Sequence, residues 1–296
     1  MPECRRVAFI GLGRMGGPMA DHVIADGHEV CVVDVSPAAV DPRAKAGAKV
    51  AADPAAAARD AEFIHIVVVD DAQVREVLTG PEGALLTAPP GCVVSIHSTA
   101  ELATIEDVAA VAFRRDVTVL DAGVSGGERG ALDGTLITMV GGPHGAVDQA
   151  RPVFGAFSRE VIHAGPLGTG MSLKLARNAA GYIMMAAVHE AMSLTQSAGV
   201  DLDVLRHVLV ASDVQSMAMA PFLLGGPDPL GADEPAERRT FLEHTNRLAE
   251  KDMAQALALA RRLDVSTPVL AAAEQNFRRV VRLGPGKDQE GDFAWS

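Results

Sequence analysis

The sequence predicts an α/β protein in which a doubly wound, mostly parallel sheet is followed by an all-helical C-terminal domain. Short apolar runs alternate with alanine-rich stretches through the first half of the chain, which is the pattern of βαβ units. A glycine-rich segment at 165–170 ends this alternation, and no convincing strand follows it. With 296 residues, 48% of them apolar, the chain is long enough for two cores. We therefore predict two domains, residues 1–165 and residues 166–296.

The predicted strands are short and almost uniformly apolar. Strands of this composition are usually covered by helices on both faces of the sheet. They are expected at residues 7–10, 30–33, 63–69, 93–97, 117–121, 136–140 and 161–163.

Apolar periodicity predicts helices in the second half. A long interdomain helix at 171–198 ends before Gly199, a residue favoured just after helices, and at 1.5 Å per residue it is roughly 40 Å long. Because it is apolar on most sides, we expect it to be buried all round, between the domains or against the second subunit of a homodimer or homotetramer. Other helices are expected at 19–25, 203–212, 238–263 and 268–283, with a loop at 225–235.

The composition argues against several classes of protein. A formal net charge of −12, spread along the chain, argues against nucleic acid as a ligand. Cys4, Cys31 and Cys92 form no CxxC pair, and no cluster of side chains has metal-ligand spacing, so we expect reduced thiols, a cytoplasmic protein and no metal. The N-terminal apolar run is too short for a signal peptide, and no stretch is long enough to span a bilayer.

The first predicted strand leads directly into a glycine turn and a helix. In the turn, one glycine permits the tight bend, the next lets backbone approach a pyrophosphate, and the third lets helix and strand pack closely, while the helix N-terminus offers free amides to phosphate. This fingerprint predicts a Rossmann domain that binds a nicotinamide dinucleotide; the alternative is a glycine turn without a ligand. The turn consists of Gly11, Leu12, Gly13, Arg14, Met15 and Gly16.

The acidic residue Asp34 ends the second predicted strand, 18 residues after the last glycine of the turn. A carboxylate at this place accepts hydrogen bonds from the adenosine ribose and repels a 2′-phosphate, which favours NAD over NADP. NADP stays possible, because Arg14, Arg43 or Lys45 can supply a positive charge for the phosphate.

Three further motifs carry a resemblance to a known family. They are Asp121-Ala122-Gly123-Val124-Ser125-Gly126-Gly127, the segment from Gly168 to Asn178 that reads GTGMSLKLARN, and Lys251-Asp252 at the start of a helical stretch. With the N-terminal fingerprint, the chain closely resembles the 3-hydroxyisobutyrate dehydrogenase, or β-hydroxyacid dehydrogenase, family from Phe9 to Phe293.

The resemblance implies reversible oxidation of a small 3-hydroxy acid, with hydride passing to the nicotinamide. It implies that Lys174 is the general acid/base, that Asn178 orients the substrate, and that Ser125, Gly126 and Gly127 bind its carboxylate. It also implies cofactor contacts for Val68, Val69, Thr99 and Lys251, the last near the nicotinamide end.

Elementary chemistry agrees with these roles. Lys174 and Asn178 are four residues apart on one helix, so they share a face. Loss of hydration at an apolar domain junction would lower the pKa of Lys174 toward neutrality, although most lysines instead reach solvent or pair with a carboxylate. The Ser125 turn follows a strand, where ligands of open α/β sheets bind, or it is an ordinary glycine turn. His97 and His189 lack an orienting acid on the same face, so we interpret them as structural.

The chain departs from the usual family pattern at four places around the expected crevice. Gly123 stands where proline is usual, Asp70 where proline often follows the fourth strand, His97 within a segment that is commonly Asp-Ser-Ser-Thr, and Arg177 where an asparagine pair is frequent. These differences weaken the assignment of a particular acid. Arg177 either attracts a second carboxylate or phosphate group or faces solvent. Imine or other carbonyl reduction on the same scaffold, and a non-catalytic dinucleotide sensor, are the alternative functions; Lys174 argues against both.

Overall fold

The computed structural model describes residues 4–212, 214–217 and 219–284. The chain divides into two compact units, residues 1–178 and 179–296. This division falls inside helix α8 (Thr169–Ser197), whereas the predicted boundary at 165/166 lies just before that helix.

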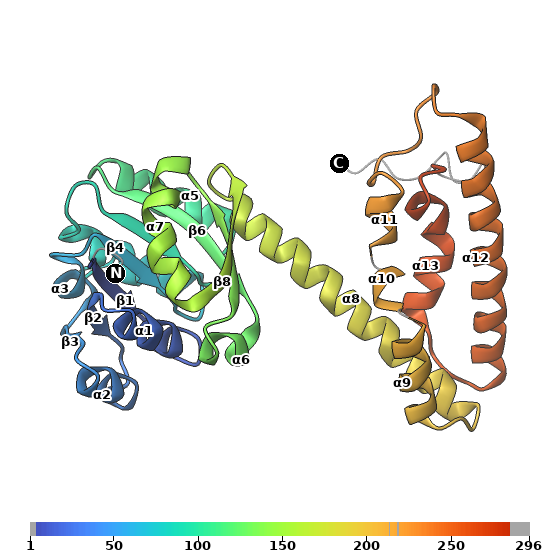
Figure 1. The fold of residues 1–296 in the computed structure, drawn as a ribbon, viewed down its shortest axis with the longest axis horizontal. Helices are drawn as coiled ribbons and strands as arrows, with labels where there is room; N and C mark the ends of the chain where they lie inside the picture. Colours follow the sequence, from blue (N-terminus) through green and yellow to red (C-terminus); the bar gives the residue numbers. More distant parts are fainter. Residues whose placement is uncertain (1–3, 213, 218, 285–296) are drawn as a thin grey trace. The chain divides into compact units, whose positions relative to one another are not determined.

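The first unit contains a sheet of eight strands (Figure 1). Its order is β3-β2-β1-β4-β5-β6-β7-β8, and all neighbours are parallel except β6 and β7. The doubly wound, mostly parallel sheet predicted from the sequence is therefore confirmed. The strands are β1 (Arg6–Ile10), β2 (Glu29–Val33), β3 (Lys49–Val50), β4 (Phe63–Ile66), β5 (Val93–Ile96), β6 (Thr118–Ser125), β7 (Leu136–Gly141) and β8 (Ser158–Gly165).

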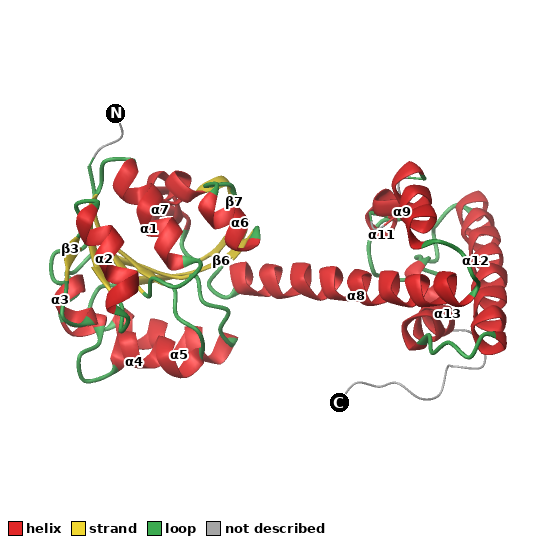
Figure 2. Cartoon of the chain, turned by 90° about the horizontal axis from the view of Figure 1, so that it is seen from below, coloured by secondary structure: helices red, strands yellow, loops and turns green. Residues whose placement is uncertain are grey.

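Helices cover both faces of this sheet, as the apolar strands predicted (Figure 2). Alternate residues of β1 enter two separate cores: Val7 and Phe9 pack on one face, Ala8 and Ile10 on the other. One face carries α1 (Gly16–Ala25), α2 (Pro37–Lys45), α6 (Gly127–Leu132) and α7 (His144–Phe157). The opposite face carries α3 (Pro54–Ala58), α4 (Asp71–Thr79), the short 3-10 helix η1 (Ala84–Leu86) and α5 (Leu102–Phe113).

Three predicted strands differ from the structure by three residues or more at one end, and tertiary partners explain the differences. The last strand, β8, was expected at 161–163 but spans Ser158–Gly165, because it pairs with β7 along that length. β4 was expected to reach residue 69 but ends at Ile66, because the amides of Val68 and Val69 turn to side-chain acceptors. β6 was expected to end at residue 121 but continues to Ser125, because β7 pairs with it in antiparallel register up to that residue. The two-residue strand β3 was not predicted.

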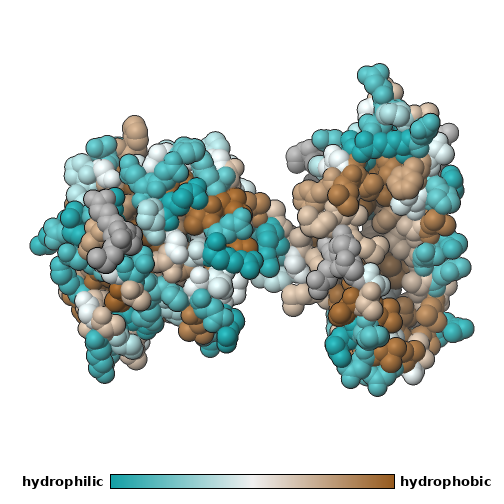
Figure 3. Space-filling model, in the orientation of Figure 1, coloured by the Kyte–Doolittle hydropathy of each residue, from teal (hydrophilic) through white to brown (hydrophobic). Residues whose placement is uncertain are grey.

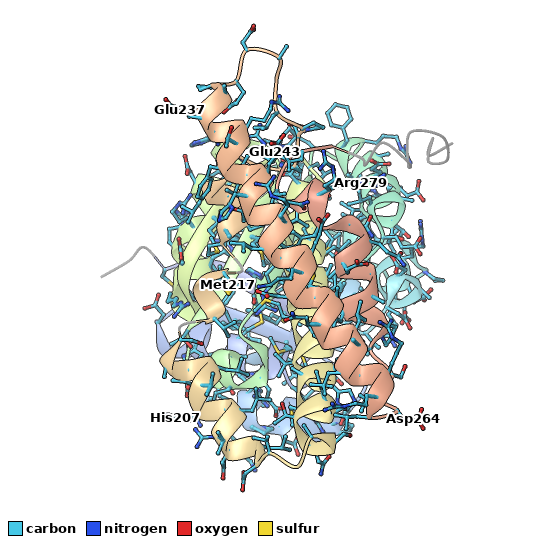
Figure 4. The ribbon with its side chains drawn as sticks, turned by 90° about the vertical axis from the view of Figure 1, so that its right-hand side faces the viewer. His207, Met217, Glu237, Glu243, Asp264 and Arg279 are labelled. Atoms are coloured by element: carbon cyan, nitrogen blue, oxygen red, sulfur yellow. The ribbon has the colours of Figure 1, made fainter. Side chains whose placement is uncertain are left out.

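The described residues after 165 form no strand, in agreement with the prediction. In the second unit α12 and α13 lie side by side and are joined by a short loop at Asp264 (Figure 4). The carboxylate of Glu190 on α8 accepts hydrogen bonds from the amides of Val269 (2.7 Å) and Leu270 (2.9 Å), so it caps the start of α13. The helices are α9 (Leu202–Ala211), α10 (Val214–Met217), α11 (Ala220–Leu223), α12 (Ala236–Arg262) and α13 (Pro268–Val280). The two short helices α10 and α11 were not predicted.

In the single chain the long helix α8 carries exposed apolar side chains, so its expected burial between the domains or against a second subunit stays a prediction. Tyr182, Ile183 and Met185 are 67%, 61% and 69% exposed. Other large apolar side chains of the second unit are also exposed, and brown patches mark apolar surface there in Figure 3. They include Val208, Val210, Met217, Met219, Phe222, Leu223 and Phe241.

Candidate active site

The glycine turn between β1 and α1 has three glycines with different surroundings. Gly11 has φ +93°, and a Cβ there would lie 2.8 Å from the carbonyl carbon of Val67; a Cβ on Gly16 would lie 3.0 Å from the Val67 Cβ. Packing of the chain therefore requires these two glycines. At Gly13 a Cβ would meet nothing within 4 Å. The middle glycine thus borders open space, as a turn that admits a pyrophosphate needs.

The N-terminus of α1 is open to an anion. Met15 occupies the position before the helix, and no side chain of the described residues caps it. Uncapped amides at the start of a ten-residue helix carry the partial positive charge that phosphate groups seek. The turn and helix therefore fit a dinucleotide.

Asp34 connects the turn to the end of β2. Its Oδ2 accepts a hydrogen bond from the amide of Leu12 (2.6 Å), and its Oδ1 accepts one from the amide of Ser36 (2.7 Å). The carboxylate thereby lies at the carboxyl edge of the sheet beside the glycine turn, and each oxygen keeps a free lone pair for a ribose hydroxyl. Of the cations considered for NADP, Arg43 is bound to Asp21 at 2.5 Å, and Arg14 lies 3.7 Å from Glu128.

The loops after β4 and β5 are connected by hydrogen bonds of Ser98, a residue for which the sequence predicted no role. The Ser98 hydroxyl accepts from the Val68 amide (2.9 Å) and donates to the Val68 carbonyl (2.8 Å). Val69 and Thr99, predicted cofactor contacts, are exposed next to these hydrogen bonds. Asp70 caps α4 through the amide of Gln73 (2.9 Å), which accounts for the acid at this position.

The predicted carboxylate-binding turn follows directly on β6. Ser125 is the last residue of the strand, and Gly126 and Gly127 have φ values of +132° and +61°. Both angles lie in the region that glycine adopts without strain. A Cβ on Gly127 would meet nothing within 4 Å, so this turn presents backbone to open space.

The first turns of α8 are fixed to the sheet by Asp121, another residue without a predicted role. Its buried carboxylate accepts hydrogen bonds from the amides of Gly168 (2.7 Å) and Met171 (2.6 Å). Burial raises the pKa of Asp121, while these amide hydrogen bonds oppose that shift. A lone acid within an otherwise apolar strand is the sequence signal for this role.

Lys174 lies one turn beyond this anchor. Its Nζ donates a hydrogen bond to the carbonyl of Val124 at 2.5 Å, so the amine lies beside the residue that precedes Ser125. Burial lowers the pKa of Lys174, and the positive charge of Arg177 lowers it further. Asn178 shares the helix face, and its Oδ1 lies 3.4 Å from Arg177 Nη1. The structure therefore brings the lysine to the Ser125 turn, as the resemblance implied.

Two buried histidines lie beneath this edge of the sheet. His97 Nδ1 lies 2.7 Å from the carbonyl of Ala122, and its Nε2 lies 2.8 Å from His65 Nδ1. Because a carbonyl can only accept, His97 Nδ1 carries a hydrogen, and in the neutral pair His65 Nδ1 donates to His97 Nε2. Burial lowers the pKa of His97 to about 4. His97 thus packs inside the unit, whereas His189 is exposed on α8.

Lys251 belongs to the second unit. It lies on α12, and its Nζ is 3.1 Å from the carboxylate of Asp252. Its approach to the nicotinamide stays a prediction. Among the described residues, no group of three or more His, Cys, Asp or Glu side chains could hold a metal ion. In the same part of the chain, no helix has the length and apolar character needed to cross a membrane.

The doubly wound sheet, the open glycine turn with its acid, and a lysine at the carboxyl edge define a dinucleotide-dependent oxidoreductase. Comparison with known families supports this class of enzyme. Residues 6–165 match the NAD binding domain of 6-phosphogluconate dehydrogenase, and residues 168–293 match the family described as NAD-binding of NADP-dependent 3-hydroxyisobutyrate dehydrogenase. The chain belongs to the β-hydroxyacid dehydrogenase family of NAD(P)-dependent enzymes.

Individual relatives match over almost the whole chain. An uncharacterized oxidoreductase of Mycobacterium tuberculosis (strain ATCC 25618 / H37Rv) is 37% identical over 93% of each chain. The NAD-dependent L-serine dehydrogenase of Pseudomonas aeruginosa is 32% identical over 95% of this chain and 93% of its own. The crystal structure of an oxidoreductase from Mycobacterium avium 104 has a TM-score of 0.82, with 37% identity over 95% of this chain and 99% of its own.

Proposed function

We propose that this protein reversibly oxidises a small 3-hydroxy acid, such as 3-hydroxyisobutyrate, with NAD as the preferred cofactor and Lys174 as the general acid/base. The observation that carries this proposal is the position of the Lys174 amine, 2.5 Å from the carbonyl of Val124, directly before the Ser125 turn. The lowered pKa of Lys174 supports the same role, because a neutral amine can accept the proton of an alcohol.

In the proposed reaction, the backbone of Ser125, Gly126 and Gly127 binds the substrate carboxylate, and Asn178 orients the hydroxyl. Lys174 takes the hydroxyl proton while the carbon bearing that hydroxyl loses a hydride and becomes a carbonyl. The bound nicotinamide supplies the acceptor for the hydride. In reduction, protonated Lys174 returns the proton to the carbonyl oxygen.

The preference for NAD is supported by Asp34, whose carboxylate lies at the glycine turn. Arg43 is paired with Asp21, and its guanidinium lies against Gly17 at the start of α1. The relative named NAD-dependent L-serine dehydrogenase also supports a small hydroxy acid and NAD. We further propose a homodimer or homotetramer, supported by the exposed apolar side chains of α8. A cytoplasmic location stays a prediction of the sequence.

The test is a panel of hydroxyisobutyrate, serine, glycerate, threonate and hydroxypropionate, each with NAD and NADP, assayed on the wild type and on Lys174→Ala. We expect NADH formation with at least one acid, and turnover lowered by orders of magnitude in the variant with NADH affinity near normal. Activity retained by Lys174→Ala would exclude the lysine mechanism. If no acid in the panel is oxidised although the cofactor binds tightly, the result would favour a dinucleotide sensor. Turnover only with imines would favour the reductase alternative.

A further inference from the structure

We infer that Gly123 is a positioning residue for Lys174: the missing side chain at this point of β6 forms the slot that holds the lysine's methylene chain. The inference rests on the proposed role of Lys174. A Cβ built on Gly123 would lie 2.6 Å from Lys174 Cδ, 2.9 Å from its Cβ and 3.3 Å from its Cγ. Carbon atoms that are not bonded to each other approach to about 3.5 Å at best. In this chain Lys174 therefore occupies the space that a Cβ at position 123 would need.

The lysine has little freedom to give way, because its helix is fixed against the same sheet. Asp121 binds the amides of Gly168 and Met171 at the start of α8. At Gly170 a Cβ would lie 2.6 Å from the carbonyl oxygen of Met139, so α8 already approaches the β6–β7 pair as closely as backbone allows. The far end of a lysine can rotate away, but its Cβ moves only with the helix.

The slot has a direct consequence for the amine. With its stem against Gly123, Lys174 extends along β6 and its Nζ reaches the carbonyl of Val124, one residue before the Ser125 turn. A methyl group at 123 pushes the stem outward, so Nζ loses this carbonyl and gains solvent. The absence of a side chain at 123 thus decides where the proton is exchanged. φ at Gly123 is not in the left-handed region, so the backbone itself does not demand glycine there.

The first test compares Gly123→Ala with Gly155→Ala, a control at an exposed position of α7 where a Cβ would meet nothing within 4 Å. We expect Gly123→Ala to keep its NADH affinity, to lose about 100-fold in kcat, as displaced catalytic groups do, and to show a raised pKa in the pH profile of kcat. Gly155→Ala should match the wild type. An unchanged kcat and pH profile in Gly123→Ala would overturn the inference.

A second test is independent of turnover. Competitive acetylation of each lysine, read by mass spectrometry across pH, reports the pKa and accessibility of Lys174 without substrate. We expect the pKa of Lys174 to rise in Gly123→Ala and to stay unchanged in Gly155→Ala. If no acid of the panel is oxidised but the pKa of Lys174 rises in Gly123→Ala, the proposed substrate class is excluded while the positioning role stands. An unchanged pKa of Lys174 would refute the positioning role whatever the activity.

A double-mutant cycle tests the contact even if Gly123→Ala is unstable. Removing the stem in Lys174→Ala eliminates the Cγ and Cδ clashes with the new methyl group. The contact with the Cβ of residue 174 remains in both backgrounds, so we expect Gly123→Ala to lower Tm more in the wild-type background than in the Lys174→Ala background. Equal losses in both backgrounds would show that the slot serves strand packing alone and would overturn the inference.

Discussion

At the scale of single residues, the departures from the usual family pattern have physical partners. Asp70 caps α4, His97 pairs with His65, Gly123 receives the lysine stem, and Arg177 lowers the pKa of Lys174 by its charge. Arg177 is exposed, three residues from the lysine on the same helix. The charge of this arginine therefore favours the neutral amine that alcohol oxidation requires.

Replacing Arg177 by asparagine should raise the pKa of Lys174. The lysine acts as a base only when neutral, so the pH of half-maximal oxidation rate should move upward, by a fraction of a pH unit because Arg177 is exposed and screened. The measurement is kcat against pH at saturating NAD. Arg114→Asn, at the end of α5, is the control and should leave the profile unchanged. A profile that moves downward would contradict the assigned charge effect.

The buried histidine pair predicts a loss of stability in mild acid. Burial lowers the pKa of His97 to about 4 and holds that of His65 well below its usual range, with the charges of His97 and His28 adding to the latter. Both folded values lie below the unfolded value of about 6.5, so the unfolded chain binds more protons between these limits. The stability that these two histidines contribute is therefore fully present above pH 6.5, and it is lost as the pH drops toward 4. For His97 alone the loss is about 3 kcal/mol.

Hydrogen exchange of the β4 and β5 amides, corrected for its intrinsic pH dependence, measures this loss in the first unit. His65→Phe preserves a ring against Phe9, on which His65 stacks, while it removes one titrating group. We expect a shallower decline of stability with acid in this variant. An identical pH dependence in both proteins would show that other groups control acid stability.

At the scale of elements, the start of α13 depends on a side chain from another helix. The Glu190 carboxylate accepts two amide hydrogen bonds there and is only 8% exposed. A buried helix end without acceptors costs about 1–3 kcal/mol for each amide that loses its partner. Tertiary capping of this kind is invisible in the local sequence of α13.

Glu190→Ala should therefore destabilise the second unit by about 2 kcal/mol or more, and Glu190→Gln by less, because the amide oxygen still accepts one hydrogen bond. Limited proteolysis and hydrogen exchange within α13 are the measurements. Glu243→Gln, on the neighbouring α12 (Figure 4), is the control and should behave like the wild type. Equal protection of α13 in Glu190→Ala and the wild type would contradict the capping role.

At the scale of the whole molecule, exposed apolar surface predicts self-association. Large side chains on α8 and α9, such as Tyr182, Met185 and Val210, are 67% to 70% exposed in the single chain. Large exposed apolar side chains gathered on a surface mark interaction sites in soluble proteins. The formal net charge of −12 makes two copies of the chain repel each other. Association therefore requires that burial of apolar surface outweigh this repulsion.

Light scattering coupled to size exclusion should accordingly give a mass of two or four chains of 30.8 kDa. Met185→Glu and Val210→Glu place charges on this surface and should lower the mass toward that of one chain. Arg114→Glu, at the end of α5 in the first unit, is the matched control and should leave the oligomer intact. A monomer at micromolar concentration would contradict the prediction.

Much of the fold followed from local pattern. The strand, glycine turn and helix at 6–25, and the shared face of Lys174 and Asn178, depend on neighbours in sequence and on the period of a helix. The extension of β6 to Ser125 did not follow, because only pairing with β7 decides it.

The cofactor turn, the acid at the end of β2 and the family's lysine were all predicted from the amino-acid sequence. Tertiary structure alone decided the contacts that place that lysine: Asp121 on the start of α8, 47 and 50 residues away, and Lys174 on the carbonyl of Val124, 50 residues away. Local propensity arises from each residue and its near neighbours, whereas such contacts depend on strand register and on how closely two backbones approach. The slot at Gly123 is a contact that depends on tertiary structure, because only the fold shows that the stem of Lys174 fills the space left by the absent side chain.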